Sequence, residues 1–281
     1  MLRASLDTLE LEYAVEGSGE PVVLIHGSIL ADYLSLVREE LTLTEQYRTM
    51  SYSRRGYAGS THPTGPLRIR EQASDCRKLM HHLGIDSAHI VGHSYGGGIA
   101  MQLAVDSPGY VRSLSLLEPV LPTGVASASR VRQQFSQAIA PVVQLFQKGE
   151  RAGAIEVFMK QVAGPDFRTM LDKALPGAFD LAVADADTFF RIELPAMQEW
   201  SLTVEDANRI KQPMLFLGRP LAETVYAPYA KELGQEMSKW FPQAETISLH
   251  GVTHAFPIAD PEGTAQTLAG FFARHSLQVI V

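Results

Sequence analysis

The feature that most constrains the fold of this chain is a serine flanked by two glycines, between a strand-like and a helix-like pattern. A short, mostly apolar run at residues 88–91 leads into Gly92-His93-Ser94-Tyr95-Gly96, and an apolar helical pattern covers residues 99–105. A serine in such a sharp turn has a strained backbone, and glycines two positions before and after it let strand and helix approach closely. Its hydroxyl is then held at a helix N-terminus, where the helix dipole and free N–H groups stabilise an oxyanion. Small residues between a strand and a helix can also serve packing alone, but the flanking pattern favours a nucleophile.

Strand-like and helix-like patterns alternate along most of the chain. Residues 22–25 form an uninterrupted branched apolar run, which is typical of a strand buried on both faces of a parallel sheet. The patterns predict further strands at residues 9–15, 47–52, 88–93, 111–117, 213–218 and 245–249, and helices at residues 32–43, 69–83, 99–105, 229–240 and 261–274. This alternation predicts an α/β fold with a mostly parallel sheet covered by helices on both faces.

The pattern changes between residues 122 and 206, where strand-like runs disappear and apolar residues recur at helical spacing. A chain of 281 residues suits one large domain or one domain with an insertion. We therefore expect an α/β core formed by residues 1–121 and 207–281, interrupted after the sixth strand by a helical insertion at residues 122–206.

The composition argues against several classes of partner and compartment. A formal net charge of −7 at pH 7 gives no overall attraction to nucleic acid or to an anionic membrane. No apolar run approaches the roughly 20 residues of a membrane span, and the first residues do not resemble a signal peptide, so we expect a soluble cytoplasmic protein. The single cysteine, Cys76, lies in a predicted helix, where we expect a buried and unreactive thiol. The sequence contains no motif that supports a nucleotide cofactor or a metal.

Three predicted strand ends and one loop carry the residue types of nucleophilic catalysis. The strand ends are followed by His26-Gly27, Ser94 and Glu118, and the loop after the last strand contains His250 and His254. Because function gathers at the carboxyl ends of strands in such sheets, we expect these residues to lie near one another. Serine needs a base, usually an imidazole held in the right tautomer by a carboxylate. We favour His254, in a glycine-containing loop, over His250, which follows the strand directly and serves the structure of the loop.

Two backbone N–H groups are the expected donors to an oxyanion. One belongs to Tyr95, the residue after the predicted nucleophile, and the other to Ser28, in the loop after residues 22–25. We expect His26 to support that loop through a hydrogen bond to backbone rather than to touch substrate. The side chains of Tyr33 and Tyr95 are candidates for lining a substrate pocket.

Four segments together resemble the α/β-hydrolase superfamily: residues 22–27 (VVLIHG), 54–60 (RRGYAGS), 92–97 (GHSYGG) and 251–254 (GVTH). The resemblance covers nearly the whole chain outside the insertion, and the chain respects the family's order of nucleophile, acid and histidine. It implies the α/β-hydrolase fold, with the insertion as a helical cap that lies over the nucleophile and shapes the substrate pocket.

The sequence departs from the common pattern of this family at the acid. Most members carry an aspartate in a Gly-X-X-Asp turn after the seventh strand, where this chain has Gly218-Arg219-Pro220-Leu221. A subset that includes haloalkane dehalogenases and zearalenone lactonases is similar in placing a glutamate after the sixth strand, the position of Glu118. Ser94 excludes the aspartate nucleophile of the dehalogenases, so the lactonase arrangement is the closer likeness. We favour Glu118 as the acid, with Glu223 as the alternative. A purely structural Glu118 also stays open, because many relatives with the usual aspartate carry Glu-Pro at this site.

Together, these residues and the resemblance predict a cofactor-independent serine hydrolase that cleaves a carboxylic ester or lactone through an acyl-enzyme. Aromatic and methionine side chains in the insertion favour a medium-sized hydrophobic substrate. The candidate pocket residues are Tyr33, Phe158, Phe189 and Trp200, each of which can instead pack the helices together. C–C bond hydrolases, amidases, perhydrolases and acyltransferases share the same triad, and the fold also serves as a small-ligand receptor without turnover. A homodimer is compatible with exposed apolar surface on the insertion.

Overall fold

The computed structural model describes residues 1–281 with the exception of residues 121, 123–127, 219–234, 236, 250–252 and 277–281. The described strands form one eight-stranded sheet in the order β1-β2-β4-β3-β5-β6-β7-β8. They are β1 (Leu2–Leu6), β2 (Leu9–Glu16), β3 (Glu20–Ile25), β4 (Tyr47–Tyr52), β5 (Ala88–His93), β6 (Val111–Leu117), β7 (Met214–Gly218) and β8 (Glu245–Ser248). The β1–β2 and β2–β4 pairs are antiparallel and the other pairs are parallel, which confirms the predicted fold class.

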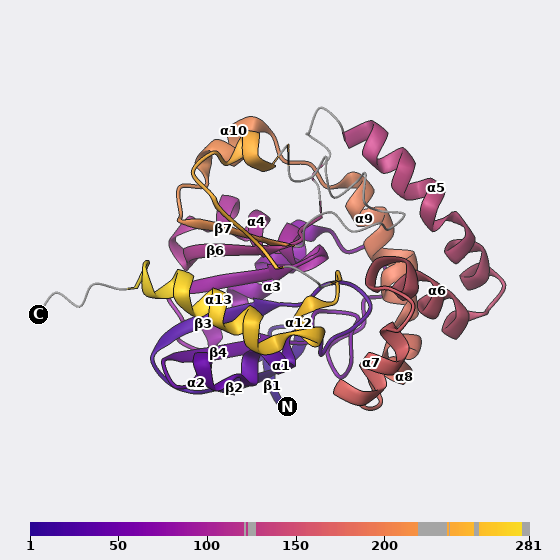
Figure 1. Cartoon of the computed structure of the whole chain (residues 1–281), viewed down its shortest axis with the longest axis horizontal. Coiled ribbons are helices and arrows are strands. Elements are labelled where there is room, and N and C mark those ends of the chain that lie inside the picture. Colours follow the sequence, from indigo (N-terminus) through magenta and orange to yellow (C-terminus); the bar gives the residue numbers. More distant parts are fainter. Residues whose placement is uncertain (121, 123–127, 219–234, 236, 250–252, 277–281) are drawn as a thin grey trace, which may run out of the picture.

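Helices connect the parallel strands and occupy the described part of the segment between β6 and β7 (Figure 1). They are α1 (Ser35–Glu39), α2 (Leu41–Thr44), α3 (Ile69–His82), α4 (Tyr95–Asp106), α5 (Ala128–Gln147), α6 (Arg151–Ala163), α7 (Phe167–Ala174), α8 (Ala178–Ala184), α9 (Leu194–Glu199), α10 (Val204–Arg209), α12 (Phe256–Ala259) and α13 (Pro261–Ala273). Two short elements accompany them, the 3-10 helix η1 (Pro108–Tyr110) and the π-helix η2 (Thr188–Glu193).

Local predictions differ from the structure at two places near the N-terminus. The sequence patterns miss β1, a short edge strand with only two inward-facing residues, which pairs with β2 through a turn where Asp7 has a φ of 58°. The helix expected at residues 32–43 is two short helices, because Glu40 has an extended backbone between α1 and α2. The helix expected at residues 229–240 lies largely outside the described residues.

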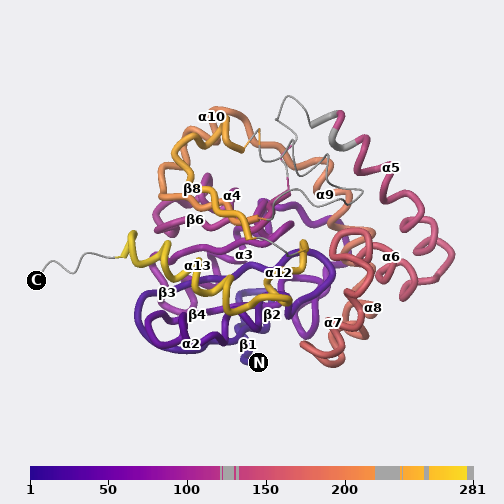
Figure 2. The backbone as a smooth tube through the Cα atoms, viewed as in Figure 1, coloured from indigo at the N-terminus to yellow at the C-terminus, as the bar shows by residue number. Residues whose placement is uncertain are grey.

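The central strand β3 is covered on both faces. Val23 and Ile25 pack into a cluster with residues of α3 and α4, whereas Val22 and Leu24 pack with residues of α1 and α13 on the other face. This alternation is the period of two that a strand imposes on its side chains. All four side chains are fully buried, so the prediction drawn from the uninterrupted apolar run is confirmed. On its face of the sheet, α13 contacts both α1 and α2. Figure 2 traces α12 and α13 as one stretch of backbone in front of the strands.

The single cysteine lies inside this core. Cys76 of α3 is fully buried in the same cluster as Val23. Burial raises the pKa of its thiol to about 12. The expected burial is confirmed, and because the thiolate is the reactive form of cysteine, the raised pKa agrees with the predicted lack of reactivity.

The helices α5 to α10, here called the helical insertion (residues 128–209), follow β6, and α5 to α8 gather on one side of the sheet, at the right in Figure 1. Much of the insertion shares one hydrophobic cluster with two loops of the core, which contribute Ile29, Leu30 and Tyr33 after β3 and Ala255 after β8. The insertion therefore packs against loops that leave the carboxyl edge of the sheet. None of the described helices is both long and apolar enough to cross a membrane.

The strand order creates a topological switch point between β3 and β5. The chain places β4 on one side of β3 and β5 on the other, so the loops after β3 and β5 leave the sheet side by side. In parallel sheets, ligands bind at such points, outside the carboxyl ends of the strands. Ser28 follows β3, Ser94 follows β5, and Glu118 follows β6, which pairs with β5. The topology therefore brings these three residues to one edge of the sheet.

Candidate active site

Ser94 occupies the strand-to-helix turn that its sequence context predicts. It lies between the last residue of β5 and the first residue of α4, with φ 51° and ψ −116°. Such a conformation costs a residue with a side chain about 1 to 3 kcal/mol, so the surrounding structure must hold it. The Ser94 N–H donates to the carbonyl of Leu117 on β6 at 2.9 Å, and the Ser94 carbonyl accepts from the N–H of Val120 at 3.1 Å. The turn is therefore tied to the neighbouring strand.

Glycines permit the close backbone approach around this turn. A Cβ on Gly92 would lie 2.5 Å from the carbonyl oxygen of Gly96, and a Cβ on Gly96 would collide with the carbonyl oxygen of Ile25 on β3. A Cβ on Gly27 would lie 3.1 Å from the Cβ of Ser94. The two glycines of the motif are thus required for packing, and the loop after β3 lies directly against the Ser94 side chain.

His254 and Glu118 meet at this edge, with Nδ1 of the ring 2.5 Å from Oε2 of the carboxylate. Their side chains are 18% and 13% exposed. Because a carboxylate only accepts hydrogen bonds, Nδ1 donates its proton in this contact. Nε2 is then the ring nitrogen that can take a proton from a nucleophile. Glu118 has a positive φ of 42°, which makes it a second strained residue beside Ser94. The alternatives for the base and the acid, His250 and Glu223, lie outside the described residues.

Two rings from the core hold the backbone of His254. The Tyr33 hydroxyl donates to the His254 carbonyl at 2.9 Å, and Nε2 of His93 donates to the same carbonyl at 3.2 Å. The two donor rings stack with their centroids 4.3 Å apart. Burial lowers the pKa of His93 well below its usual value, so this ring is neutral and carries its proton on Nε2. Tyr33 and His93 therefore fix the loop that presents His254.

The two predicted oxyanion donors, the amides of Tyr95 and Ser28, belong to the helix that follows Ser94 and to the loop after β3 that packs against it. Tyr95 is the first residue of α4, and an amide in the first turn of a helix has no acceptor within that helix. Ser28 follows Gly27, which contacts Ser94. The next residue, Ile29, has a φ of 79°, a genuine outlier for a β-branched side chain. The loop that carries the Ser28 amide is thus held in an unusual conformation.

The side chain of Tyr95 does not line a pocket, so that expectation is wrong. It is fully buried in the core, and its hydroxyl accepts a hydrogen bond from Nε2 of Gln72 on α3 at 3.1 Å. The first turn of α4 directs this ring towards α3, so only the backbone of Tyr95 can serve the site.

His26 supports the loop after β3, as predicted. Its Nε2 accepts from the backbone N–H of Arg54 at 3.0 Å, so Nδ1 carries the proton and donates to the Gly27 carbonyl at 2.7 Å. Burial and the neighbouring Arg54 guanidinium lower the pKa of His26, which keeps the ring neutral. The ring is buried, and both of its nitrogens form hydrogen bonds with backbone groups.

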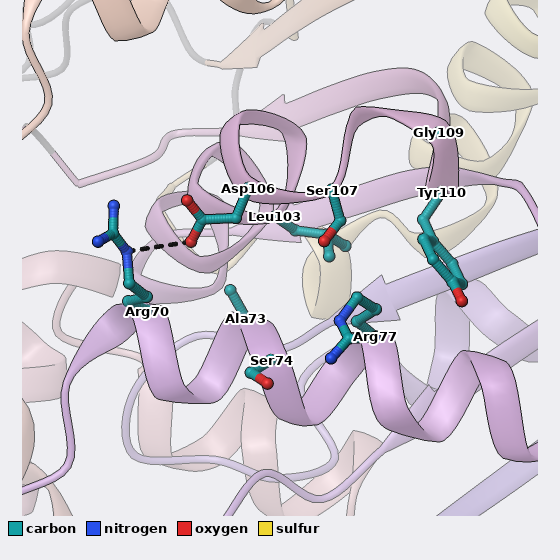
Figure 3. A pocket seen from close by; sticks show the side chains of 9 residues that line it. All are labelled: Arg70, Ala73, Ser74, Arg77, Leu103, Asp106, Ser107, Gly109 and Tyr110. Atoms are coloured by element: carbon teal, nitrogen blue, oxygen red, sulfur yellow. Dashed lines mark ion pairs between the residues drawn. The ribbon is translucent and has the colours of Figure 1, made fainter.

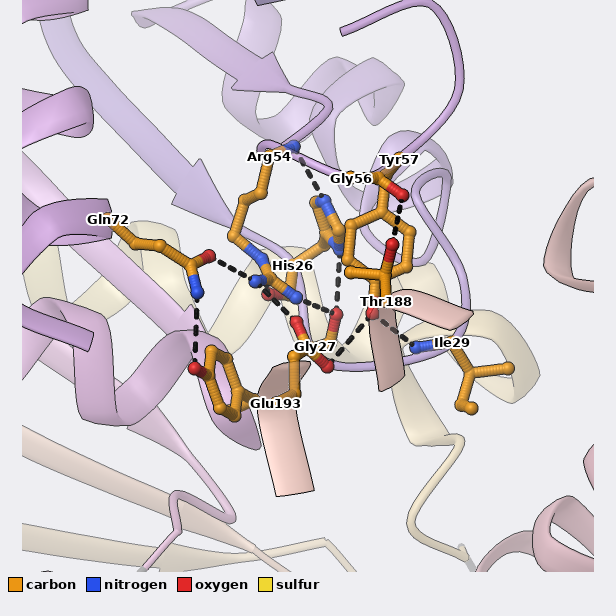
Figure 4. A network of polar contacts seen from close by, with 10 residues as sticks. His26, Gly27, Ile29, Arg54, Gly56, Tyr57, Gln72, Thr188 and Glu193 are labelled. Atoms are coloured by element: carbon orange, nitrogen blue, oxygen red, sulfur yellow. Dashed lines mark hydrogen bonds and ion pairs between the residues drawn. The ribbon is translucent and has the colours of Figure 1, made fainter. Parts of the chain in front are cut away.

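Three residues without a predicted role form a buried network behind this loop (Figure 4). Arg54, after β4, donates to the carbonyls of His26 and Gly27 and forms an ion pair with Glu193 of η2. The Tyr57 hydroxyl donates to the same carboxylate at 2.9 Å. The sequence marks the loop after β4 by its arginines and glycines, but nothing distinguishes Glu193 from other charged residues in the helical pattern of the insertion.

The candidate pocket residues divide between two hydrophobic clusters. Tyr33, Phe158 and Phe189 belong to the cluster between the insertion and the core loops, with the two phenylalanine rings 4.7 Å apart. Trp200 belongs to the cluster on α4, where its Nε1 donates to the side chain of Gln102 at 2.9 Å. All four candidates are buried in packing contacts, and a role in substrate binding stays a prediction.

A cavity of about 610 Å³ lies between α3 and the C-terminal end of α4 (Figure 3). Its lining residues are Arg70, Ala73, Ser74, Arg77, Leu103, Asp106, Ser107, Gly109 and Tyr110. Arg70 and Asp106 form an ion pair there with an N–O distance of 3.1 Å. At a rise of about 1.5 Å per residue, the length of α4 separates this cavity from Ser94 by roughly 15 Å, so it is distinct from the candidate site.

Comparison with known proteins gives matches along most of the chain. Residues 22–267 match the model of the alpha/beta hydrolase family. The chain is 34% identical over 150 residues to the dihydrolipoyllysine-residue acetyltransferase component of the acetoin cleaving system of Cupriavidus necator, covering 50% of this chain and 39% of that protein. It is 29% identical over 137 residues to 3-oxoadipate enol-lactonase 2 of Acinetobacter baylyi, covering 48% of this chain and 51% of that protein. These matches span about half or less of the curated relatives. The crystal structure of the enol-lactonase of Burkholderia xenovorans has the same fold, with a TM-score of 0.78 at 20% identity over 97% of this chain and 100% of that one.

Proposed function

The chain belongs to the alpha/beta hydrolase family, and on that premise we propose that it is a cofactor-independent serine hydrolase that cleaves a carboxylic ester or lactone. The observation that carries the proposal is the 2.5 Å contact between His254 and Glu118 at the same sheet edge as the strained turn of Ser94. Serine is a poor nucleophile unless a base takes its proton, and a carboxylate on the other ring nitrogen fixes the tautomer of that base. Ser94, His254 and Glu118 are here called the carboxyl-edge site.

The first half of the proposed reaction forms an acyl-enzyme. Oγ of Ser94 attacks the substrate carbonyl carbon while its proton passes to Nε2 of His254. The carbonyl oxygen becomes negative and accepts hydrogen bonds from the N–H groups of Tyr95 and Ser28. Glu118 keeps its charge and stabilises the imidazolium through Nδ1–H. The C–O bond of the leaving group then breaks, His254 returns the proton to the alcohol oxygen, and the acyl group stays on Ser94.

The second half repeats the same proton transfers with water. Nε2 of His254 takes a proton from a water molecule, whose oxygen attacks the acyl carbon. The tetrahedral intermediate uses the same two amides, and its collapse breaks the bond to Oγ of Ser94. His254 then gives the proton back to Ser94, and the carboxylic acid leaves. For a lactone, the acid and the alcohol are parts of one opened ring.

The apolar surroundings of the site support a medium-sized hydrophobic substrate. The cluster that joins the insertion to the core combines Tyr33 after β3 with Phe158 and Phe189 of the insertion. This cluster adjoins the loop that carries Ser28, so apolar groups lie next to a proposed oxyanion donor. A role for the insertion as a cap over the carboxyl-edge site is part of the same proposal. The two relatives named enol-lactonases support the inclusion of lactones.

The test is multiple-turnover hydrolysis of a panel of chromogenic esters of rising acyl length, beside aromatic and aliphatic lactones. Each substrate is assayed with the wild-type protein and with Ser94→Ala. We expect turnover that the substitution abolishes, and the best substrate defines the class. Equal inertness of both proteins towards every panel member would contradict the proposal. Binding of an apolar ligand without turnover would then identify the fold as a receptor.

A further inference from the structure

The helical insertion places one carboxylate deep inside the core. Glu193 is fully buried, and its Oε1 lies 2.6 Å from Nη1 of Arg54, whose side chain is only 1% exposed. Removing two charges from water costs several kcal/mol for each ion, so apolar side chains of similar volume would often be at least as stable. We therefore expect this ion pair to matter for the geometry of the residues around it rather than for the stability of the protein.

Three hydrogen bonds, together with the ion pair to Glu193, hold the planar guanidinium of Arg54. Nε of Arg54 donates to the His26 carbonyl at 3.1 Å, Nη2 donates to the Gly27 carbonyl at 2.7 Å, and Nη1 donates to Oε1 of Gln72 at 2.5 Å. Burial alone would lower the pKa of Arg54, but the Glu193 carboxylate, together with Tyr57 and Tyr95, outweighs burial, so the pKa lies above its usual value. The guanidinium is therefore charged. Because acceptors lie on several of its sides, its N–H groups can bond to all of them in only one orientation.

The Gly27 carbonyl connects this guanidinium to the proposed oxyanion donor. The carbonyl of Gly27 and the N–H of Ser28 belong to one planar peptide unit and point in opposite directions. Arg54 and His26 both donate to the carbonyl at 2.7 Å, so they also set the direction of the Ser28 N–H. A cation on the carbonyl polarises the peptide unit and makes its N–H a stronger donor.

The same carboxylate also holds the peptide on the other side of Ser28. Its Oε2 accepts from the Tyr57 hydroxyl at 2.9 Å, and that hydroxyl accepts from the backbone N–H of Ile29 at 3.1 Å. Ile29 is the residue with the positive φ of 79°. Glu193 is thus linked to both neighbours of Ser28. Arg54 connects it to Gly27, and Tyr57 connects it to Ile29 (Figure 4).

We propose that Glu193 is a positioning residue of the insertion that sets the Ser28 amide for oxyanion binding. The inference rests on the proposed serine-hydrolase function and deepens it, because it makes the transition-state geometry of the core depend on the insertion. A disturbed oxyanion donor weakens binding of the transition state more than binding of the substrate, so kcat should fall while KM changes little.

The test compares Glu193→Gln with a matched control, Asp185→Asn. Glutamine keeps the size of the side chain and a hydrogen bond to Tyr57 but removes the charge that holds Arg54. Asp185 is also a buried carboxylate of the insertion. It accepts from the backbone N–H of Ala58 at 2.8 Å, in the same loop as Arg54, and lies 3.7 Å from Nε2 of His62. Loss of one oxyanion donor costs about 100- to 1,000-fold, so we expect Glu193→Gln to lower kcat by about 10- to 100-fold with KM within about threefold. For Asp185→Asn, kcat and KM should both stay within about threefold of the wild type.

A boronic acid gives a second readout, because its adduct with Ser94 places an oxygen where the oxyanion forms. Its inhibition constant should rise in Glu193→Gln by about the factor by which kcat/KM falls. Rates are normalised to the fraction of enzyme that the boronic acid titrates, which removes differences in folding. If Glu193→Gln does not fold, Tyr57→Phe is the alternative, because it removes only the hydrogen bonds of the Tyr57 hydroxyl to Glu193 and Ile29. We expect a smaller fall in kcat, about 3- to 10-fold, again without a matching change in KM.

The outcomes separate the two proposals. Wild-type turnover that equals that of Ser94→Ala overturns the proposed function, and the role of Glu193 with it. Wild-type turnover that requires Ser94, together with equal kcat values in Glu193→Gln and Asp185→Asn, overturns the positioning role alone. A change in KM without a change in kcat or in boronic acid affinity also overturns it, because that pattern belongs to ground-state binding.

Discussion

Within the described residues, serine, histidine and glutamate occur together at both ends of the parallel strands: in the proposed carboxyl-edge site and in a second cluster at the opposite end. The second cluster, here called the amino-edge cluster, joins the beginnings of three neighbouring strands. Nδ1 of His89 lies 2.7 Å from Oγ of Ser113, and Nε2 lies 3.2 Å from Oε2 of Glu20. The amino-edge cluster thus links a hydroxyl to a carboxylate through one imidazole, with the same three residue types as the carboxyl-edge site.

The two clusters differ in access and in the backbone around the serine. Ser113 and His89 are fully buried, and the histidine ring stacks on Phe272 with centroids 4.5 Å apart. Ser113 lies within β6 directly opposite His89, where ladder bonds occupy backbone groups. Ser94 instead precedes a helix, whose first amides have no acceptor in the helix. A nucleophile therefore needs free amides and an accessible base as well as the right side chains.

The largest expected contrast is between the two serines. Ser94→Ala removes the proposed nucleophile and should lower kcat/KM by about 10⁶-fold, whereas Ser113→Ala should leave it within about threefold because no substrate reaches a fully buried hydroxyl. Both variants are assayed on the best ester or lactone of the panel. The prediction would be wrong if Ser113→Ala lost a comparable amount of activity while circular dichroism showed a folded protein, because Ser113 would then be as important for turnover as Ser94.

The two glutamates provide the next contrast. Glu118→Gln keeps the size of the side chain but no longer fixes the tautomer of His254, so kcat should fall by about 10⁴-fold with the fold intact. Glu20→Gln, at the amino edge, should leave kcat within about threefold. Steady-state kinetics on both variants tests the pair. Near-normal turnover of Glu118→Gln would transfer the role of the acid to Glu223.

The buried histidine of the amino-edge cluster should make stability depend on pH. Burial lowers the pKa of His89 to about 4, whereas an unfolded histidine titrates near about 6.5. Between these values the unfolded chain binds more protons, so the free energy of unfolding decreases as the pH falls, by up to about 1.4 kcal/mol per pH unit from this group. Above about pH 6.5 the contribution is fully present.

The matched variant is His89→Gln, which keeps polar contacts but does not titrate. Urea unfolding from about pH 7 down to about pH 4.5 should give a shallower pH dependence for this variant than for the wild type. His26 and His93, whose pKa values burial also lowers, are present in both proteins, so the difference isolates His89. Identical slopes would show that His89 titrates alike in the folded and unfolded chains.

The sequence predicts those parts of the fold and the site that depend on local pattern. The apolar run of β3, the glycines around Ser94 and the strand end before Glu118 all carry their signal within a few residues, and the structure has each of them where it was expected. By contrast, the pairing of Arg54 with Glu193 joins residues far apart in the chain. No local pattern distinguishes such a glutamate from one on a solvated helix face, because the difference arises only when the insertion packs against the core.

Backbone conformation is a second limit of the sequence. The positive φ of Ser94 follows from a recognisable turn motif, but those of Ile29 and Glu118 have no sequence signature, because neither is a glycine, asparagine or aspartate. The same holds for the amino-edge cluster, whose histidine and serine occupy ordinary strand positions. Their contact depends on the register between β5 and β6, which pairs His89 with Ser113.

The smallest expected contrast is in stability, and it has opposite signs at the two serines. Ser94→Gly should raise the free energy of unfolding by about 1 kcal/mol, because relief of about 1 to 3 kcal/mol of backbone strain exceeds the about 0.5 to 1 kcal/mol that glycine costs through the freer unfolded chain. Ser113→Ala should lower it by about 1 to 2 kcal/mol, because Nδ1 of the buried His89 loses its partner. Urea unfolding of both variants at neutral pH measures the two changes. A loss of stability in Ser94→Gly would mean that the turn is held by contacts of the serine side chain, and the carboxyl-edge site would then resemble the amino-edge cluster in being built for stability.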